Sequence, residues 1–163
     1  MKRLLTFAAL VLICFSLSAQ KNKKEQDKEL IRQETEAIKS VIVKETKSFF
    51  ETDKTSWKEC WVQAPHAYWS FADSTDVNFY KGWDNIEKGF ADYFKQSKPA
   101  QVKIENSWDN VKIYGTGAFV SFRQRVSGDG IERDEQSEVR ILEKDNMGNW
   151  KIVHVGVIRK PKT

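Results

Sequence analysis

Residues 115–159 read GTGAFVSFRQRVSGDGIERDEQSEVRILEKDNMGNWKIVHVGVIR. Three segments rich in β-branched, aromatic and alternating residues, 118–127, 131–144 and 150–159, are separated by short turns. The turns contain glycine, asparagine and aspartate, which adopt the tight backbone conformations that hairpins need. Consecutive strands joined in this way run antiparallel. This stretch therefore predicts a three-stranded antiparallel meander.

The segment before the meander continues the strand pattern. Apolar residues alternate with polar ones around Val102 and Ile104, and again around Val111 and Ile113. Residues 108–110 interrupt the alternation. We therefore expect further antiparallel strand here, with a break near residues 108–110.

Helices are expected ahead of these strands. Residues 25–50 contain neither proline nor glycine and repeat apolar side chains every three or four positions, which is typical of a long amphipathic helix. Asp53 then offers a carboxylate to the free N–H groups of a short helix over residues 54–61. The spacing of residues 82–95 predicts a third helix.

A short strand and a loop are expected between the second and third helices. Residues 67–71 predict the strand and residues 73–78 the polar loop. At the start of the third helix, Asp84 and Glu87 have the spacing of a capping box. Helices segregated ahead of an antiparallel sheet predict the α+β class, with three N-terminal helices packed on the sheet.

Three short motifs stand in order along this layout. They are the corner Thr52-Asp53-Lys54-Thr55-Ser56-Trp57, the helix start Gly82-Trp83-Asp84-Asn85-Ile86 and the closing strand Gly148-Asn149-Trp150-Lys151-Ile152-Val153-His154. Together they resemble the motifs of the nuclear transport factor 2-like superfamily, in its SnoaL-like branch, over about residues 33–158. The resemblance implies a cone-shaped fold, in which a bent antiparallel sheet wraps helices and leaves a pocket at its mouth. The branch contains small-molecule enzymes, binding proteins and secreted proteins of unassigned activity.

The start of the chain has the layout of a secretory signal peptide. A basic start is followed by an almost wholly apolar run and by small residues that precede a cleavage site near Ala19. The apolar run is shorter than the roughly 20 residues of a membrane span. We therefore expect a secreted or periplasmic protein. Its expected segments are a signal peptide over residues 1–19, a tail and the start of the first helix over residues 20–32, and the SnoaL-like domain over residues 33–160.

Loss of the leader changes the charge and the cysteine content. The 163-residue chain has a net formal charge of +4. Cleavage would remove the two positive charges of Lys2 and Arg3. Of the two cysteines only Cys60 would remain, so we expect no internal disulfide and a small buried side chain rather than a reactive thiol. The basic residues form no patch interleaved with aromatic residues. We therefore expect no nucleic-acid partner, and no membrane partner after cleavage.

The family's chemistry leaves few candidate catalytic residues in this chain. Steroid-isomerase relatives place a carboxylate at the end of the first strand, where this chain has Ser70, with Asp73 three residues on. Relatives that dehydrate ring substrates use paired histidines, whereas this chain has only His66 and His154. Asp73 and His154 are weak candidates for a general base, with Tyr68 as the electrophile. The histidines and cysteines lack metal-ligand spacing, so we expect no metal site and no cofactor.

Aromatic residues of the helices and the first strand are the main reason to expect a pocket. Tryptophan and tyrosine combine an apolar ring with a polar tip that a ligand can use. The expected pocket residues are Trp57, Trp61, Tyr68, Trp69, Trp83, Tyr93, Phe94 and His154. Three functions stay open. We favour binding of a small, mostly apolar molecule; the alternatives are a non-catalytic scaffold or interaction module, and an isomerase, cyclase or dehydratase.

The charged residues of the meander could lie inside the cone or on its outer surface. Opposite charges pair best if Arg125 lies opposite Glu132 and Arg123 lies opposite Asp134. In that register the residues on one face are Phe119, Arg123, Arg125, Glu138 and Arg140. Turned into the cone, this face would hold anions. Turned outward, which we favour, it would be a solvated surface.

The last strand is expected to be apolar on both faces. Its alternating residues are Trp150, Ile152 and Ile158 on one face and Val153, Val155 and Val157 on the other. The helices can cover only one face of a sheet. We therefore expect a second subunit to cover the other face, which gives a homodimer through the open face of the sheet.

Overall fold

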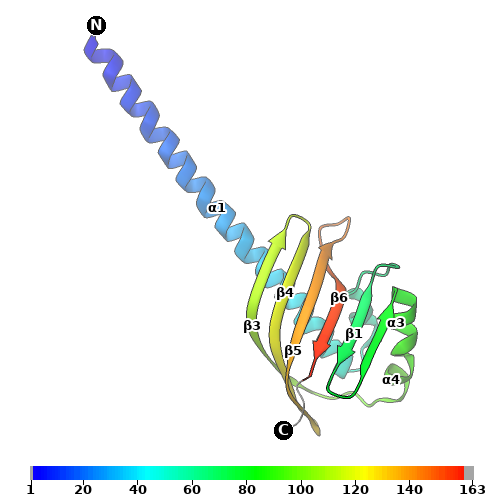
Figure 1. The fold of residues 1–163 in the computed structure, drawn as a ribbon. Coiled ribbons are helices and arrows are strands. Elements are labelled where there is room, and N and C mark those ends of the chain that lie inside the picture. Colours follow the sequence, from blue (N-terminus) through cyan, green and yellow to red (C-terminus); the bar gives the residue numbers. More distant parts are fainter. Residues whose placement is uncertain (1, 160–163) are drawn as a thin grey trace. The chain divides into compact units, whose positions relative to one another are not determined.

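The computed structural model describes the backbone of residues 2–159 and the side chains of residues 23–159 (Figure 1). The chain divides into two compact units, residues 1–36 and residues 37–163. The predicted signal peptide falls in the first unit, where the side chains of its residues lie outside the described ones. Within the described part of the chain, none of the helices combines the length and the apolar character needed to cross a bilayer.

Six strands form one curved sheet, in the order β2-β1-β6-β5-β4-β3 (Figure 1). The strands are β1 (Tyr68–Ala72), β2 (Val77–Lys81), β3 (Lys103–Tyr114), β4 (Gly117–Gly128), β5 (Ile131–Lys144) and β6 (Trp150–Ile158). The α+β class and the predicted meander, which is β4, β5 and β6, are confirmed. The predicted break near residues 108–110 is a register shift inside one continuous strand, β3.

Two features of the sheet differ from the prediction. β1 pairs with β6 in parallel, so the sheet is mixed rather than wholly antiparallel. The segment predicted as a polar loop, residues 73–78, ends inside the edge strand β2. β2 pairs only with β1 and most of its side chains are exposed. An edge strand of this kind carries no alternation of buried and exposed residues, which is the signal that reveals strands in a sequence.

The β4–β5 hairpin contains a β-bulge. Gln124 lies opposite Gln136 but Val126 lies opposite Arg133, so two residues of β5 stand opposite Arg125 alone. An extra residue of this kind shifts the alternation of side chains by one position. Arg133 and Gln136 are three positions apart, and yet both line the cavity on the inner face of the sheet.

The predicted register of this hairpin is wrong for two reasons: next to the turn the strands pair two residues away from the register chosen by charge pairing, and the bulge then adds a shift of one residue. Arg123 lies opposite Ser137 and Glu132 lies opposite Ser127, so neither expected charge pair forms across the strands. Arg123 instead lies 3.4 Å from Glu135. The five residues placed on one face divide between two: Phe119, Arg123 and Arg125 are exposed, whereas Glu138 and Arg140 are buried on the inner face.

A second irregularity lies in β6. The β5–β6 register shifts between Ile141 and Leu142, because Val153 has no partner across the pair. Ile152 and Val155 are both buried as a result, although regular alternation places them on opposite faces. The shift therefore directs more of the apolar side chains of β6 toward the core than the sequence predicts.

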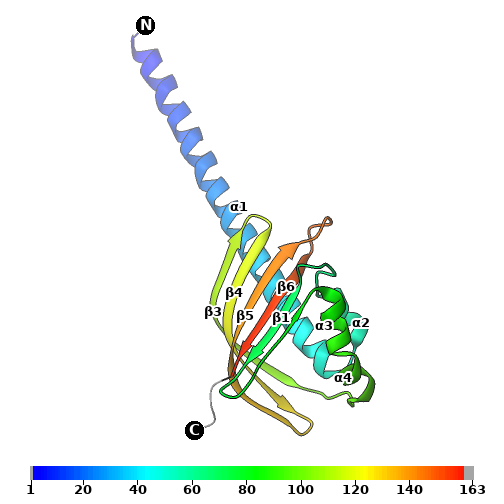
Figure 2. The same cartoon turned by 45° about the vertical axis from the view of Figure 1, so that its right-hand side comes forward.

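Helices cover the inner face of the sheet (Figure 2). They are the part of α1 (Lys2–Phe50) that belongs to the second unit, α2 (Lys54–Glu59), α3 (Trp83–Gly89) and α4 (Ala91–Gln96). The predicted end of the first helix at Phe50 is confirmed. The predicted cap of α2 is confirmed too, since the Ser56 backbone N–H donates to Asp53 Oδ1 at 3.0 Å.

The predicted third helix is two short helices, α3 and α4. Gly82 is the N-cap of α3 at φ 82°, a left-handed conformation that suits glycine, and no side chain caps this end. The capping box proposed for Asp84 and Glu87 is therefore wrong. The Glu87 carboxylate instead lies 2.9 Å from both Lys54 and Lys58 of α2, and it thereby joins α3 to α2.

Candidate functional site

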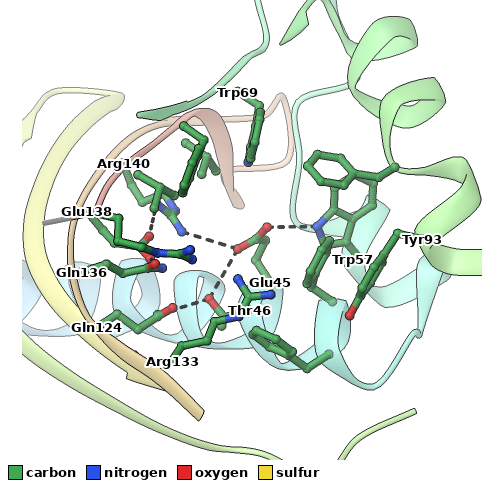
Figure 3. Close-up of a pocket in the computed structure, with 17 residues that line it drawn as sticks. Glu45, Thr46, Trp57, Trp69, Tyr93, Gln124, Arg133, Gln136, Glu138 and Arg140 are labelled. Carbon is green, nitrogen blue, oxygen red and sulfur yellow. Dashed lines mark hydrogen bonds and ion pairs between the residues drawn. The ribbon is translucent and has the colours of Figure 1, made fainter. Parts of the chain in front are cut away.

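A cavity of about 330 Å³ lies between the inner face of the sheet and the helices (Figure 3). Two chemically distinct sets of side chains line it. The apolar set includes Phe49, Phe50, Trp69, Phe71, Phe90 and Val157. The polar set includes Glu45, Thr46, Gln124, Gln136, Glu138 and Arg140. A wall of this composition can hold a small organic molecule that has both apolar and polar parts.

The polar set is built around a buried ion cluster of Glu45, Glu138 and Arg140. Arg140 Nη1 lies 2.5 Å from Glu138 Oε2, and Arg140 Nη2 lies 3.8 Å from Glu45 Oε2. Glu138 and Arg140 are two positions apart on β5, which places both on the same face of the sheet. α1 supplies Glu45 from the opposite side of the cavity (Figure 3). No member of the cluster is more than 7% exposed.

Neighbouring side chains complete part of the hydrogen bonding of this cluster. Trp57 Nε1–H donates to Glu45 Oε1 at 2.9 Å, and Gln136 Nε2–H donates to Glu138 Oε1 at 2.5 Å. Within the described residues, Gln136 Oε1 and Arg140 Nε are buried without a hydrogen-bond partner. Buried polar atoms are nearly always paired in native proteins. These two atoms depart from that pattern, and each exposes less than 1 Å² of surface, so neither is open to a molecule in the cavity.

Glu45 gives the protein a characteristic pH dependence. Burial raises the pKa of Glu45 above its ordinary 4.5, although the charge of Arg140 opposes the shift. In the unfolded chain the carboxyl ionises at its ordinary pKa, so raising the pH above 4.5 favours unfolding. We expect the free energy of unfolding of the wild type to fall relative to that of Glu45→Gln as the pH rises from 4.5 to 8, in urea titrations.

The matched control for this pH dependence is Glu105→Gln. Glu105 is an exposed carboxyl whose pKa is lowered, chiefly by its hydrogen bond with Lys103. Removing it should change stability little and with the opposite dependence on pH. If the free energy of unfolding of the wild type stays constant or rises relative to that of Glu45→Gln as the pH rises, the burial of Glu45 is contradicted.

The structure divides the predicted pocket residues into three groups. Trp57, Trp69 and Tyr93 line the cavity. Trp61, Trp83 and Phe94 pack in the core around Trp57, with ring centroids 5.8, 5.5 and 5.0 Å from that of Trp57. Tyr68 and His154 lie outside the cavity wall, where their rings meet edge to face at 5.2 Å.

The candidate bases do not reach the cavity either. Asp73 is partly exposed, and hydrogen bonds from Thr75 and Asp76 lower its pKa. His154 is partly buried beside Ser70 Oγ, at 3.2 Å, and burial lowers its pKa. Ser70, which follows Trp69 on β1, points away from the cavity that Trp69 lines. The residue expected from the resemblance to stand where relatives carry a carboxylate, Ser70, therefore faces the outer side of the sheet.

The remaining predicted residues are structural or lie at the surface. Cys60 is a buried free thiol, as predicted, and burial raises its pKa to about 12. His66 Nε2 lies 3.0 Å from Glu143 Oε1 at the surface. Among the described side chains, no group of three or more histidine, cysteine, aspartate or glutamate residues is placed to hold a metal ion.

Fourteen of the 17 residues that line the cavity were not among the predicted pocket residues, and they include the charged and amide side chains Glu45, Gln124, Arg133, Gln136, Glu138, Arg140 and Arg159. Glu45 stands in the apolar stripe of the first helix, and a carboxylate in such a stripe is a readable signal of a buried polar site. Gln136, Glu138 and Arg140 alternate along β5 in phase with the buried Leu142. Arg133 is three positions from Gln136, so regular alternation places it on the opposite face. It faces the cavity because of the bulge, which the sequence pattern does not show.

Comparison with solved structures identifies the type of fold. No protein-family profile and no curated protein matches the chain. A nuclear transport factor 2-like superfamily protein from Salmonella enterica serovar Typhimurium is 22% identical at a TM-score of 0.56, over 77% of this chain and 90% of that one. A protein of unknown function of the same type from Shewanella baltica is 19% identical at a TM-score of 0.58, over 80% and 96%. The chain therefore has the nuclear transport factor 2-like fold, which confirms the fold that its sequence motifs imply.

Proposed function

We propose that this protein binds a small organic molecule in the cavity, without turning it over. The observation that carries the proposal is the juxtaposition of the aromatic wall with the buried ion cluster inside one cavity of about 330 Å³. Aromatic rings offer the area that holds an apolar body, and a few fixed polar groups orient the bound molecule. A secreted or periplasmic location, for which the apolar leader argues, would suit a binding protein.

Binding is favoured over catalysis by the placement of the candidate bases. Asp73 and His154 lie outside the cavity wall. Inside it, both oxygens of Glu45 already face protein groups, since Oε1 accepts from Trp57 and Oε2 lies near Arg140. A general base needs a free oxygen within reach of the proton that it removes.

The test is native mass spectrometry of the protein purified from its own source, followed by a thermal-shift screen of small metabolites. We expect a retained small molecule or a reproducible stabilisation. Val157→Trp fills the cavity from its wall and should abolish both signals. The control Ile158→Trp adds the same ring at the next residue, which is 57% exposed, and should keep both signals. Finding no retained molecule and no stabilisation, or equal signals in the two variants, would contradict the proposal.

A second candidate function, self-association through the outer face of the sheet, is favoured by a row of residues across four strands. Phe119 lies opposite Ile141, Ile141 opposite His154, and His154 opposite Tyr68. Phe119 and Ile141 are 38% and 42% exposed, and Phe79 stacks on Tyr68 with 60% of its own surface exposed. We propose that a second copy of the chain covers this outer row.

Light scattering after size exclusion measures this association. We expect a dimer mass at micromolar concentration, and we expect Ile141→Lys to weaken the dimer by about tenfold or more, because the ammonium group would be desolvated at the contact. Met147→Lys makes the same change at an 83% exposed turn residue and should leave the mass unchanged. A wild type that runs as a monomer overturns this candidate.

A further inference from the structure

Two arginines of the cavity wall form no ion pair with a carboxylate of the described residues. Of the three arginines there, Arg140 is paired with Glu138 and Glu45. Within residues 23–159, Arg133 and Arg159 have no carboxylate oxygen within 4.0 Å. Both are nevertheless partly buried. Burial of a guanidinium without a counter-ion is unfavourable unless something else supplies the negative charge.

Each of these guanidinium groups is held in place by an aromatic ring. Arg133 Cζ lies 4.9 Å from the centroid of Phe50, and Arg159 Cζ lies 5.1 Å from that of Phe71. Both rings also line the cavity. Stacking of this kind orients a guanidinium while its N–H groups remain free to donate. The two arginines are thus held in position, and no side-chain hydrogen bond joins them to an acceptor among residues 23–159.

The backbone fixes the two arginines at the cavity from different strands. The bulge in β5 turns Arg133 to the inner face, as described above. Arg159 directly follows β6, and its N–H donates to Ala72 O at 2.9 Å, which ties it to the end of β1. Burial lowers the pKa of Arg133, and the nearby positive charge of Arg159 lowers it further. An anion near both groups would relieve this repulsion.

We propose that the molecule bound in the cavity is an organic acid, whose carboxylate is held by Arg133 and Arg159 while its apolar body packs on the aromatic wall. The inference rests on the proposed function and names its ligand class. A planar carboxylate matches the fork of a guanidinium in two-point geometry. The aromatic wall beside the arginines selects an acid with an apolar body over a small inorganic anion.

The experiment compares carboxylates with their uncharged primary amides on the full chain by isothermal titration calorimetry. The pairs are benzoate, 3-phenylpropanoate, indole-3-acetate and octanoate, each with its amide, and inorganic phosphate is measured alone. We expect at least one carboxylate to bind about tenfold or more tightly than its amide. Arg133→Met and Arg159→Met, which keep an unbranched apolar side chain, should each remove this preference and leave the affinity for the amide within about threefold.

The control variant is Arg125→Met, which removes an exposed arginine from the neighbouring strand and should keep the full preference. Equal binding of acid and amide, or a preference that survives both cavity variants, overturns the inference but leaves the proposed function standing. Phosphate that binds as tightly as every carboxylate also overturns it, because the apolar wall would then contribute nothing. Failure of every acid and every amide to bind contradicts the proposed function itself.

Discussion

Arg140→Met is expected to lower the free energy of unfolding by about 3–5 kcal/mol, because the change leaves two buried carboxylates without their cation. Arg140 is 3% exposed, and its guanidinium lies between Glu138 and Glu45. The loss should be larger at pH 8 than at pH 5, since burial raises the pKa of Glu45 and the substitution removes the charge of Arg140 that opposes this shift. Urea unfolding followed by tryptophan fluorescence measures both effects.

Two further variants test whether the loss of stability in Arg140→Met comes from the buried ion cluster. Arg123→Met removes an arginine from the exposed face, where its partners Asp109 and Glu135 are also exposed, and should cost less than about 1 kcal/mol. The triple variant Glu45→Gln, Glu138→Gln, Arg140→Met carries no buried charge and should recover most of the lost stability. If Arg140→Met is as stable as Arg123→Met, the cluster is not buried in solution.

Trp57→Ala is the second large effect, with an expected loss of about 3–5 kcal/mol. Trp57 is 1% exposed, and its ring contacts those of Trp61, Trp83, Phe90 and Phe94. Its removal leaves a hole between α2, α3 and α4 and also deprives Glu45 of a hydrogen bond. Thermal unfolding by calorimetry, together with urea titration, gives the change.

Trp57→Phe separates the packing of the ring from the hydrogen bond of its N–H. Phenylalanine keeps most of the aromatic contact but cannot donate to Glu45, so we expect a smaller loss of about 1–3 kcal/mol. Tyr114→Ala removes an aromatic ring that is 69% exposed and should change stability by no more than about 0.5 kcal/mol. Equal losses in Trp57→Ala and Trp57→Phe would show that the ring packing contributes little.

Regular local patterns explain which parts of the fold could be predicted from the sequence. The bounds of β5, Ile131–Lys144, agree with the prediction because glycine and aspartate turns flank a clear strand pattern. The Asp53 cap followed from side-chain chemistry within four residues. The parallel pairing of β1 with β6 could not be predicted in this way, because it joins segments that no turn connects.

The candidate site was harder to predict because it depends on departures from regular alternation. Period-two reasoning put Arg123 on the same face as Arg140, and the bulge between them separates the two. It also gave no reason to place Arg133 beside Gln136. The aromatic part of the site was easier, because Trp57, Trp69 and Tyr93 are large rings on elements that cover the sheet. Their neighbours Trp61 and Trp83 have the same chemistry and pack in the core, since composition alone cannot tell a cavity wall from a filled interior.

The parallel β1–β6 pair has a consequence for the order in which the domain assembles and opens. β3 to β6 form by successive hairpins between neighbouring segments, whereas Ser70 on β1 meets His154 on β6 from 84 residues away. Contacts between distant segments are made late, because loop closure opposes them. Within the sheet β2 pairs with β1, so loss of the β1–β6 pairing separates both strands from the rest of the sheet, although Tyr80 of β2 also contacts Phe90. Trp69 and Phe71 belong to this strand pair and line the cavity, so its detachment would open the cavity while the meander stays folded and would give the proposed ligand an exit.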